Sequence, residues 1–555
     1  MPRLLVIGLD GATLDLVRPW AAAGRLPVLA RLMATGAWGP LRSTLPAATF
    51  PAWTSLVTGV NPGRHGVFDF TERVPGTYRV RFVNGSFRRM PALWTRLSAA
   101  GRRVAVLTVP GTYPPEPACG VMVSGFDSPL ATAIDGSFVH PRALYREIQR
   151  AVGRVPFADF QEVTTGPGWH AVALARLLEG VERRTKLAAW LLERERWGAL
   201  MVVFGESDTV AHHFWRFHDP RSPRHAPSPF AGAIARVYAA LDRALGALLA
   251  AAPPDTAVAI VSDHGSGGAS DRVVHLNRRL AAGGLLAFRP ATRGRVAGLV
   301  RAAALRGVPP RLQGVLVRRA PAAAGRLEGI YRLAGIDWSR TVAYSEELDY
   351  HPSVWLNLRG REPEGVVAPG AYAATRERVA AALAAWRDEA GRPVVERVWR
   401  REELYAGPFV ERAPDLVLEL APVDGYSPSC LPSVGAGPAL RRLVPAEHGG
   451  GKGRGMNGAH RQLGLFVLAG PGVRPAGQLA PADIVDVLPT LLALAGGPVP
   501  GGLDGRPIAG ALDAPPRSAP DPLAEAALAP RPFDGDETRD LAARLAALGY
   551  LEPEA

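Results

Sequence analysis

The sequence predicts an α/β protein with a largely parallel central sheet that is buried between helices. Short apolar runs that end in polar or glycine-containing turns predict strands at residues 4–9, 104–109, 200–204, 257–261, 416–420 and 465–468. Long Ala/Leu/Arg segments with helical spacing lie between them, at 171–195 and 231–251 for example. Strands that alternate with helices favour a parallel sheet covered on both faces.

The 555 residues are too many for one simple core, and changes in composition suggest how they divide. We expect the first part of the core at 1–280 and a second part, with a small subdomain, at 341–512. Residues 281–340 are basic, helical in pattern and poor in strands, which predicts a helical insertion or cap. Residues 513–555 read as a Pro/Ala-rich linker and a C-terminal amphipathic helix.

Composition narrows the classes of function. The net charge is +13, but the arginines are scattered and form no dense basic run, so we expect attraction to anionic substrates and no specific nucleic-acid binding. The two cysteines, Cys119 and Cys430, lie far apart, which suits a reducing compartment. No uncharged apolar run reaches the roughly 18 residues that span a bilayer. We therefore expect a cytoplasmic protein without a membrane span; its oligomeric state is left open.

Three predicted strands are followed by acidic residues. Asp10 ends the first strand, Asp208 lies just past the third, and Asp263 with His264 follows the fourth. Ligand sites of open α/β sheets lie beyond the carboxyl ends of the strands, so these side chains are expected to converge. Converging carboxylates repel one another unless a cation lies between them. A metal site is the simplest interpretation.

Two histidines extend this set. His212 follows Asp208 by four residues, which places both on one face of a helix, and His460 precedes the last predicted strand. Taken singly, each has a structural explanation, as a solvated helix pair or a core histidine. Taken together, the carboxylates and imidazoles suit Zn²⁺ or Mn²⁺ better than Ca²⁺ or Mg²⁺.

The order and context of these motifs resemble the alkaline phosphatase superfamily, specifically the type I phosphodiesterase/nucleotide pyrophosphatase branch and its predicted phosphohydrolase/phosphomutase relatives. The matching pieces are "IGLDG", "TFPAWTSLVTGVNPGRHGVFDF", "SDTVAH", "SDHG" and "GAHR". The resemblance implies an alkaline phosphatase-like fold and two divalent ions, Zn²⁺ with Mn²⁺ as the alternative. The implied ligands of the first ion are Asp208, His212 and His460. Those of the second are Asp10, Asp263 and His264, with the oxygen of Thr49 facing it.

Thr49 is the nucleophile that the resemblance implies. A threonine hydroxyl is a poor nucleophile until a metal or a base activates it. Because Pro51 marks the first turn of a helix, Thr49 is expected at or just before a helix N-terminus, where negative charge is stabilised. A simple helix cap is the alternative.

The sequence departs from the family pattern at one position. Nucleotide pyrophosphatases carry a phosphate-binding Asn soon after the "TG" motif, whereas the matching spacing here holds Asp69 and Phe70. Other donors could serve, namely Asn61, Arg64, His65, Lys452, Arg454 or Asn457. The Gly-rich segment before His460 is either a lid or a flexible loop.

We therefore predict a metal-dependent phosphohydrolase that cleaves a small phosphate ester through a phosphothreonine intermediate, of the phosphodiesterase/nucleotide pyrophosphatase type. Two alternatives stay open: a phosphomutase or phosphotransferase of the same superfamily, and a non-catalytic protein that binds anionic ligands. Trp53 and Trp94 are expected in the core or in a pocket wall.

Overall fold

The computed structural model describes residues 3–125, 134–157, 166–289, 333, 335–347, 352–433, 435–448 and 455–523. The expected insertion at 281–340 and the expected helix at the C-terminus lie largely outside these residues, as do Lys452 and Arg454. The proposed division into domains therefore stays a prediction.

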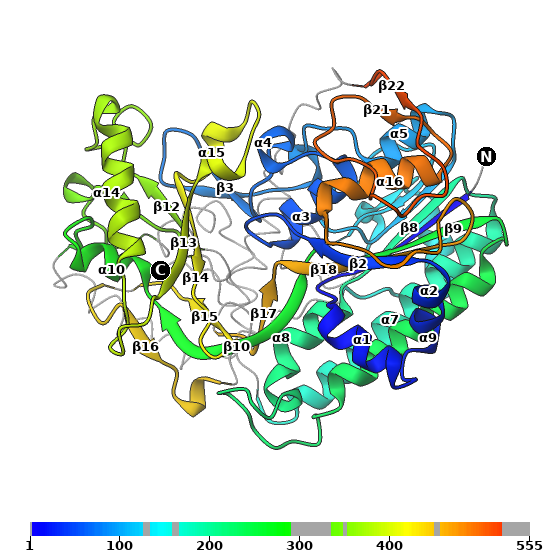
Figure 1. The fold of residues 1–555 in the computed structure, drawn as a ribbon, viewed down its shortest axis with the longest axis horizontal. Helices are drawn as coiled ribbons and strands as arrows, with labels where there is room; N and C mark the ends of the chain where they lie inside the picture. The colour runs from blue at the N-terminus through cyan, green and yellow to red at the C-terminus, as the bar shows by residue number, and fades with distance from the viewer. Residues whose placement is uncertain are drawn as a thin grey trace.

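A ten-stranded central sheet organises the fold (Figure 1). Its strand order is β19-β2-β18-β9-β1-β8-β5-β6-β7, and β20 also pairs with β2. The strands are β1 (Arg3–Leu9), β2 (Ala37–Arg42), β5 (Val104–Leu107), β6 (Gly120–Val123), β7 (Val139–His140), β8 (Ala199–Phe204), β9 (Thr256–Val261), β18 (Leu463–Ala469), β19 (Gly477–Gln478) and β20 (Ala482–Asp483). The run β9-β1-β8-β5-β6 is parallel, whereas β18 is antiparallel to both of its neighbours.

Helices cover both faces of this sheet, as the sequence predicts. Alternate residues of β1 point to opposite faces: Leu5 and Ile7 belong to one hydrophobic core, and Leu4 and Val6 to the other. The first core contains residues of α1 (Leu14–Ala22), α2 (Pro27–Thr35), α6 (Leu144–Val152), α7 (Trp169–Arg194), α8 (Glu206–His218) and α9 (Ala233–Ala251). The second contains residues of α3 (Thr49–Thr58), α5 (Leu93–Ala99) and α16 (Val487–Leu494).

One of the predicted strands lies outside the central sheet. Residues 416–420 form β14 (Leu416–Leu420), which belongs to an antiparallel sheet in the order β11-β12-β14-β13. Its partners are β11 (Ala343–Tyr344), β12 (Ser353–Leu356) and β13 (Val395–Arg400). An apolar run shows that a strand is buried but does not show which sheet contains it, so this assignment required the structure.

We call the antiparallel sheet and its helices α14 (Tyr372–Ala384) and α15 (Arg401–Leu404) the second lobe; it lies to the left in Figure 1. The long strand β10 (Gly265–Val274) leads toward it from the central sheet and pairs with β15 (Ser427–Cys430), β16 (Leu440–Arg442) and β17 (Gly458–Arg461). The short helix α10 (Leu276–Ala282) packs in the hydrophobic core of this lobe.

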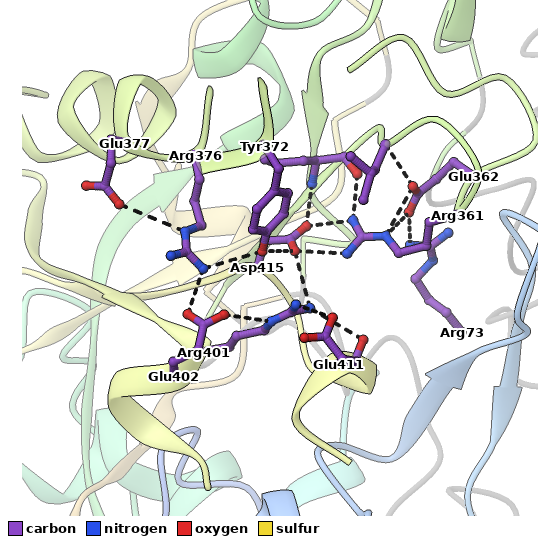
Figure 2. Close-up of polar contacts among 12 residues, drawn as sticks. Arg73, Arg361, Glu362, Tyr372, Arg376, Glu377, Arg401, Glu402, Glu411 and Asp415 are labelled. Carbon is purple, nitrogen blue, oxygen red and sulfur yellow. Dashed lines mark hydrogen bonds and ion pairs between the residues drawn. The ribbon is translucent and has the colours of Figure 1, made fainter. Parts of the chain in front are cut away.

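A buried carboxylate is the centre of a polar network in the second lobe (Figure 2). Asp415 is fully buried and accepts hydrogen bonds from Arg361, from the Tyr372 hydroxyl and from the backbone of Leu356. These contacts hold the pKa of Asp415 below its ordinary value although burial alone would raise it, so the carboxylate remains charged.

The same network contacts the first part of the chain through Arg73. This residue ends β3 (Thr71–Arg73), which pairs with β4 (Val80–Phe82), and its guanidinium lies 2.6 Å from Glu362 of the second lobe. The hairpin that follows α3 and α4 (Pro62–His65) is thereby joined to the second lobe.

Asp242→Ala is expected to lower the free energy of unfolding by about 3 kcal/mol. Asp242 is buried on α9, and its two oxygens accept from the backbone N–H groups of Val28 and Leu29 at 3.0 and 2.8 Å. These groups lie in the first turn of α2, whose own cap residue has no side-chain hydrogen bond. Denaturant titration measures the loss, and Asp255→Ala, which removes an exposed carboxylate, should stay within about 0.5 kcal/mol of wild type.

Candidate metal and nucleophile site

The candidate site lies where three adjacent parallel strands end. Asp10 follows β1, Asp263 follows β9, and Asp208 lies in the first turn of α8 directly after β8. Because β9, β1 and β8 are neighbours and run in the same direction, their carboxyl ends lie at one edge of the sheet. Three carboxylates that are far apart in the sequence therefore meet.

The backbone beside Asp10 is fixed by hydrogen bonds on every side. The carbonyl of Asp10 accepts from Ser207 Oγ at 2.6 Å, the Gly11 carbonyl accepts from Ser266 Oγ at 2.5 Å, and the Gly11 N–H donates to Asp263 Oδ1 at 3.2 Å. Gly11 has a φ of +64°, and a Cβ there would lie 2.7 Å from Asp208 Oδ1. The position therefore requires glycine for both its conformation and its contact.

The ligand atoms form two groups. In the first, Asp208 Oδ1 lies 3.2 Å from His212 Nε2 and 3.6 Å from His460 Nε2, and the two Nε2 atoms are 3.1 Å apart. In the second, His264 Nε2 lies 3.5 Å from Asp10 Oδ1 and 3.3 Å from Asp263 Oδ2. The rings of His264 and His460 stack with centroids 3.7 Å apart, so the two groups are in contact. His264 also lies close enough to Asp208 and His460 to share an ion with them.

All three histidines present the same ring nitrogen to the site. Their Nδ1 atoms lie 2.7–3.0 Å from backbone carbonyl oxygens, of Gly458 for His212, Gly265 for His264 and Ala47 for His460. A carbonyl oxygen only accepts, so each Nδ1 carries a proton and each Nε2 is turned toward the site, where it is available to a metal ion. In this position each Nε2 can bind a metal ion beside the carboxylates once it carries no proton.

The buried polar atoms give the same result. Among the described residues, Asp10 Oδ1, Asp208 Oδ1, Asp263 Oδ2 and His264 Nε2 are buried without a hydrogen-bond partner. These atoms are the ones through which the side chains of each group approach one another. Buried polar atoms are almost always satisfied, so four that converge indicate a bound ion. The donor set of carboxylate oxygen and imidazole nitrogen fits a divalent metal of the zinc or manganese class.

Burial and mutual repulsion disfavour the charged forms of two of the three carboxylates. Burial raises the pKa of Asp10 well above its ordinary value, and the charges of Asp263 and Asp208 raise it further. Burial likewise raises the pKa of Asp263 well above its ordinary value. Burial also raises the pKa of Asp208, but the nearby His212 and His460 outweigh it and lower the pKa below the ordinary value. Positive charge at the centre of the group would let all three carboxylates ionise.

Thr49 is the first residue of α3, and Ala48 is the N-cap. The first helical hydrogen bond runs from Ala52 N–H to the Ala48 carbonyl, so the N–H groups of Thr49 and Phe50 precede it. Thr49 therefore lies one position inside the helix, and within the described residues its hydroxyl makes no hydrogen bond. It does not act as the helix cap.

Trp53 belongs to the site, although the sequence predicted only a core or pocket-wall role. Its indole is fully buried, and Nε1–H donates to Asp10 Oδ2 at 3.0 Å, which leaves Asp10 Oδ1 to face His264. Trp53 follows Thr49 by four residues on α3, so both side chains lie on one face of the helix. This spacing was the available signal, and it places Thr49 one turn from a residue that contacts Asp10.

Several candidate phosphate donors are engaged elsewhere. Asn61 bonds to Ala406 and Asp504, and Arg64 forms an ion pair with Asp504 at 2.8 Å. Phe70, at the position of the expected Asn, packs against Phe50 with ring centroids 4.5 Å apart. Asn457 is buried, and its Oδ1 has no hydrogen-bond partner among the described residues. Oδ1 is an acceptor and cannot bind a phosphate oxygen, so this unpartnered atom does not identify Asn457 as the phosphate donor.

His65, another candidate phosphate donor, joins α4 to α3 through a hydrogen bond. It is fully buried, its Nδ1 accepts from Val67 N–H at 3.2 Å, and its Nε2–H donates to Ser55 Oγ at 2.8 Å. Burial lowers its pKa from 6.5 to about 3, with a further contribution from Arg88. The imidazole is therefore neutral and structural.

Acidification is expected to destabilise the protein through His65. Below pH 6.5 the unfolded chain binds a proton that the folded chain does not bind until about pH 3, so stability is lost as the pH falls through this window. The loss is about 1.4 kcal/mol per pH unit, or about 2 kcal/mol at pH 5. Unfolding free energies measured from pH 8 to pH 5 should show a shallower slope for His65→Gln. His225→Gln, at an exposed histidine, should keep the wild-type slope; equal slopes for all three proteins would refute the assignment.

The sequence model of the type I phosphodiesterase/nucleotide pyrophosphatase family matches residues 4–428. The chain belongs to this family. It is therefore a phosphoester hydrolase of the phosphodiesterase/pyrophosphatase type, and the family implies the use of divalent metal ions. The matched range ends before His460, which the fold nonetheless brings to Asp208.

Two solved structures are similar to this chain. Phosphonoacetate hydrolase from Sinorhizobium meliloti 1021, in complex with phosphonoformate, is 18% identical with a TM-score of 0.51, and the match covers 89% of this chain and 96% of that one. An inactive murine ectonucleotide pyrophosphatase/phosphodiesterase 5, in complex with AMP, is 12% identical with a TM-score of 0.46, covering 90% and 96%. No curated protein matches the sequence. The first likeness confirms the alkaline phosphatase-like fold that the sequence predicts.

Among the described residues, no helix combines the length and the apolar character needed to cross a membrane.

Proposed function

We propose that this protein hydrolyses a small phosphodiester through a covalent phosphothreonine at Thr49, with two divalent ions held by the site. The observation that carries the proposal is the set of buried, partnerless atoms that converge from Asp10, Asp208, Asp263 and His264. Thr49 begins the helix whose next turn contacts Asp10 through Trp53.

The proposed ligands follow the two groups of side chains. The first ion would take Asp208, His212 and His460, and the second Asp10, Asp263 and His264, with the Thr49 oxygen beside it. Zn²⁺ is the proposed ion and Mn²⁺ the alternative, because both accept mixed nitrogen and oxygen ligands. When bound, the ions would supply Lewis-acid stabilisation of the Thr49 alkoxide, the phosphoryl oxygens and the leaving oxygen.

The chain's own residues then carry out a double displacement. Thr49 loses its proton to solvent, and a bond forms from Oγ1 to phosphorus while the bond from phosphorus to the leaving oxygen breaks. Water attacks the phosphothreonine in the second step, the bond from phosphorus to Oγ1 breaks, and Thr49 recovers a proton. The N-terminus of α3 stabilises negative charge at Thr49 in both steps.

The test is hydrolysis of bis(p-nitrophenyl) phosphate and of p-nitrophenyl phosphate by protein stripped with a chelator and reloaded with Zn²⁺ or Mn²⁺. We expect turnover only after reloading, with the diester preferred. Activity that survives removal of the metal would contradict the proposal. Product analysis with an added acceptor alcohol distinguishes the hydrolase from a phosphotransferase, because only a transferase forms the new ester as its main product.

The cellular location is also a proposal. Two cysteines that lie far apart in the sequence suit the reducing cytoplasm, as expected from the sequence.

A further inference from the structure

The loop that leads into Thr49 is held at each of its carbonyl groups. The Leu45 carbonyl accepts from Tyr405 Oη at 2.6 Å, the Pro46 carbonyl from Thr44 Oγ1 at 2.7 Å, and the Ala47 carbonyl from His460 Nδ1 at 2.7 Å. The next carbonyl, that of Ala48, accepts the first hydrogen bond of α3. The path of the backbone into Thr49 is therefore set by four consecutive hydrogen bonds.

The donors on either side of this loop come from different parts of the molecule. His460 lies on β17 beside the candidate ligand Asp208, so it ties Ala47 to the proposed metal centre. Tyr405 directly follows α15 in the second lobe and lies 360 residues from Leu45. The loop is thus held by the metal centre on one side and by the second lobe on the other.

Tyr405 is itself firmly placed. Its side chain is 4% exposed, and its ring meets Phe68 edge to face with centroids 5.1 Å apart. Phe68 lies in the segment that follows α4, whereas Leu45, which accepts from the hydroxyl, precedes α3, so Tyr405 contacts the chain on both sides of these two helices. A buried ring with two fixed neighbours holds its hydroxyl with little freedom.

The residues after Tyr405 continue along the nucleophile segment. Ala406 N–H donates to Asn61 Oδ1 at 3.1 Å, and Asn61 Nδ2 donates to the Ala406 carbonyl at 2.9 Å. Phe409 N–H donates to the Gly63 carbonyl at 2.9 Å, and Arg412 forms an ion pair with Glu72. The stretch 405–412 therefore runs beside residues 45–72. Of the residues that it contacts, Leu45, the partner of Tyr405, is the nearest to Thr49 in sequence.

From these contacts we infer that Tyr405 is a positioning residue for Thr49, through which the second lobe fixes the nucleophile against the metal centre. The inference rests on the proposed function, because it assigns Thr49 as the attacking group. A displacement of about 1 Å at an attacking atom costs on the order of 100-fold in rate, so a hydroxyl that fixes the loop has a measurable effect. A residue that only stabilised the lobe would lower the melting temperature and leave the chemistry unchanged.

The experiment compares Tyr405→Phe with Tyr372→Phe in the metal-loaded full-length protein. Each change removes one hydroxyl in the same lobe; that of Tyr372 bonds to Asp415 and does not reach the loop. For Tyr405→Phe we expect kcat toward bis(p-nitrophenyl) phosphate to fall between about 10-fold and 100-fold, with KM and metal affinity within about twofold of wild type. Tyr372→Phe should keep the wild-type kcat.

The outcomes separate the inference from the function on which it rests. If Tyr405→Phe keeps kcat within about twofold while Thr49→Ala is inactive, the positioning role is wrong and the proposed nucleophile stands. If Thr49→Ala keeps full activity, the proposed function itself is wrong. A fall in kcat that Tyr372→Phe reproduces at an equal loss of melting temperature would also overturn the inference, since it would reflect stability alone.

Discussion

Replacing Thr49 by alanine is expected to lower kcat for phosphodiester hydrolysis by about 10⁴-fold or more, because the substitution removes the attacking atom. The residue is the first of α3, and the substitution removes only the oxygen that faces the second ion while the carboxylate and histidine ligands proposed for both ions stay. Bound metal and the melting temperature should therefore stay close to the wild-type values. The measurement is steady-state turnover of bis(p-nitrophenyl) phosphate at saturating metal, with metal content determined on the same sample.

Two variants make this result specific. Thr49→Ser keeps a hydroxyl and should retain a large part of the turnover, whereas Thr54→Ala removes another buried hydroxyl of α3 and should leave kcat within about threefold of wild type. Wild-type turnover in Thr49→Ala would show that another group, or water directly, attacks phosphorus.

Gly11→Ala is expected to weaken metal binding by about 100-fold, although it adds only one methyl group and alters no proposed ligand. The new Cβ would lie 2.7 Å from Asp208 Oδ1 and 2.9 Å from Ser266 Oγ, so Asp208 or the Gly11 backbone has to move. Either movement changes the separation of the two ligand groups. Competition with a chromophoric chelator measures the dissociation constants of the bound ions.

The matched control is Gly24→Ala. Gly24 has a similar left-handed φ of +72°, but a Cβ there would meet no atom within 4 Å. Gly24→Ala should therefore lower the free energy of unfolding by about 1 kcal/mol through backbone strain. Its metal affinity should equal that of the wild type. If Gly11→Ala keeps the wild-type dissociation constants for metal, the close approach of Gly11 to Asp208 does not determine metal affinity.

Much of the fold follows from local patterns in the sequence. The apolar runs at 4–9, 200–204 and 257–261 correspond to the adjacent strands β1, β8 and β9, and the segments 171–195 and 231–251 to α7 and α9. The position of an acidic residue directly after a parallel strand is also a local feature. For this reason the meeting of Asp10, Asp208 and Asp263 could be expected from the sequence.

The contacts that fix the site could not be predicted in this way. The four-residue spacing places Trp53 on the same face of α3 as Thr49, but it does not show that the indole N–H reaches Asp10. Nothing local to Tyr405 shows that its hydroxyl reaches Leu45. Both contacts join elements that are distant in the sequence, and a buried aromatic residue has the same local pattern in a core and beside a site. The assignment of 416–420 to the second lobe was beyond local patterns for the same reason.

The central claim is that a phosphoryl group is transferred to Thr49, and trapping this intermediate tests it most directly. Metal-loaded protein is mixed with excess bis(p-nitrophenyl) phosphate, quenched in acid during turnover, digested and analysed by mass spectrometry, with Thr49→Ala treated in parallel. We predict a p-nitrophenyl phosphate ester on Thr49, formed as one p-nitrophenolate leaves, that appears during turnover, decays when substrate is exhausted, and is absent from Thr49→Ala. Phosphorylation at a different residue, with Thr49 unmodified throughout turnover, would contradict the account.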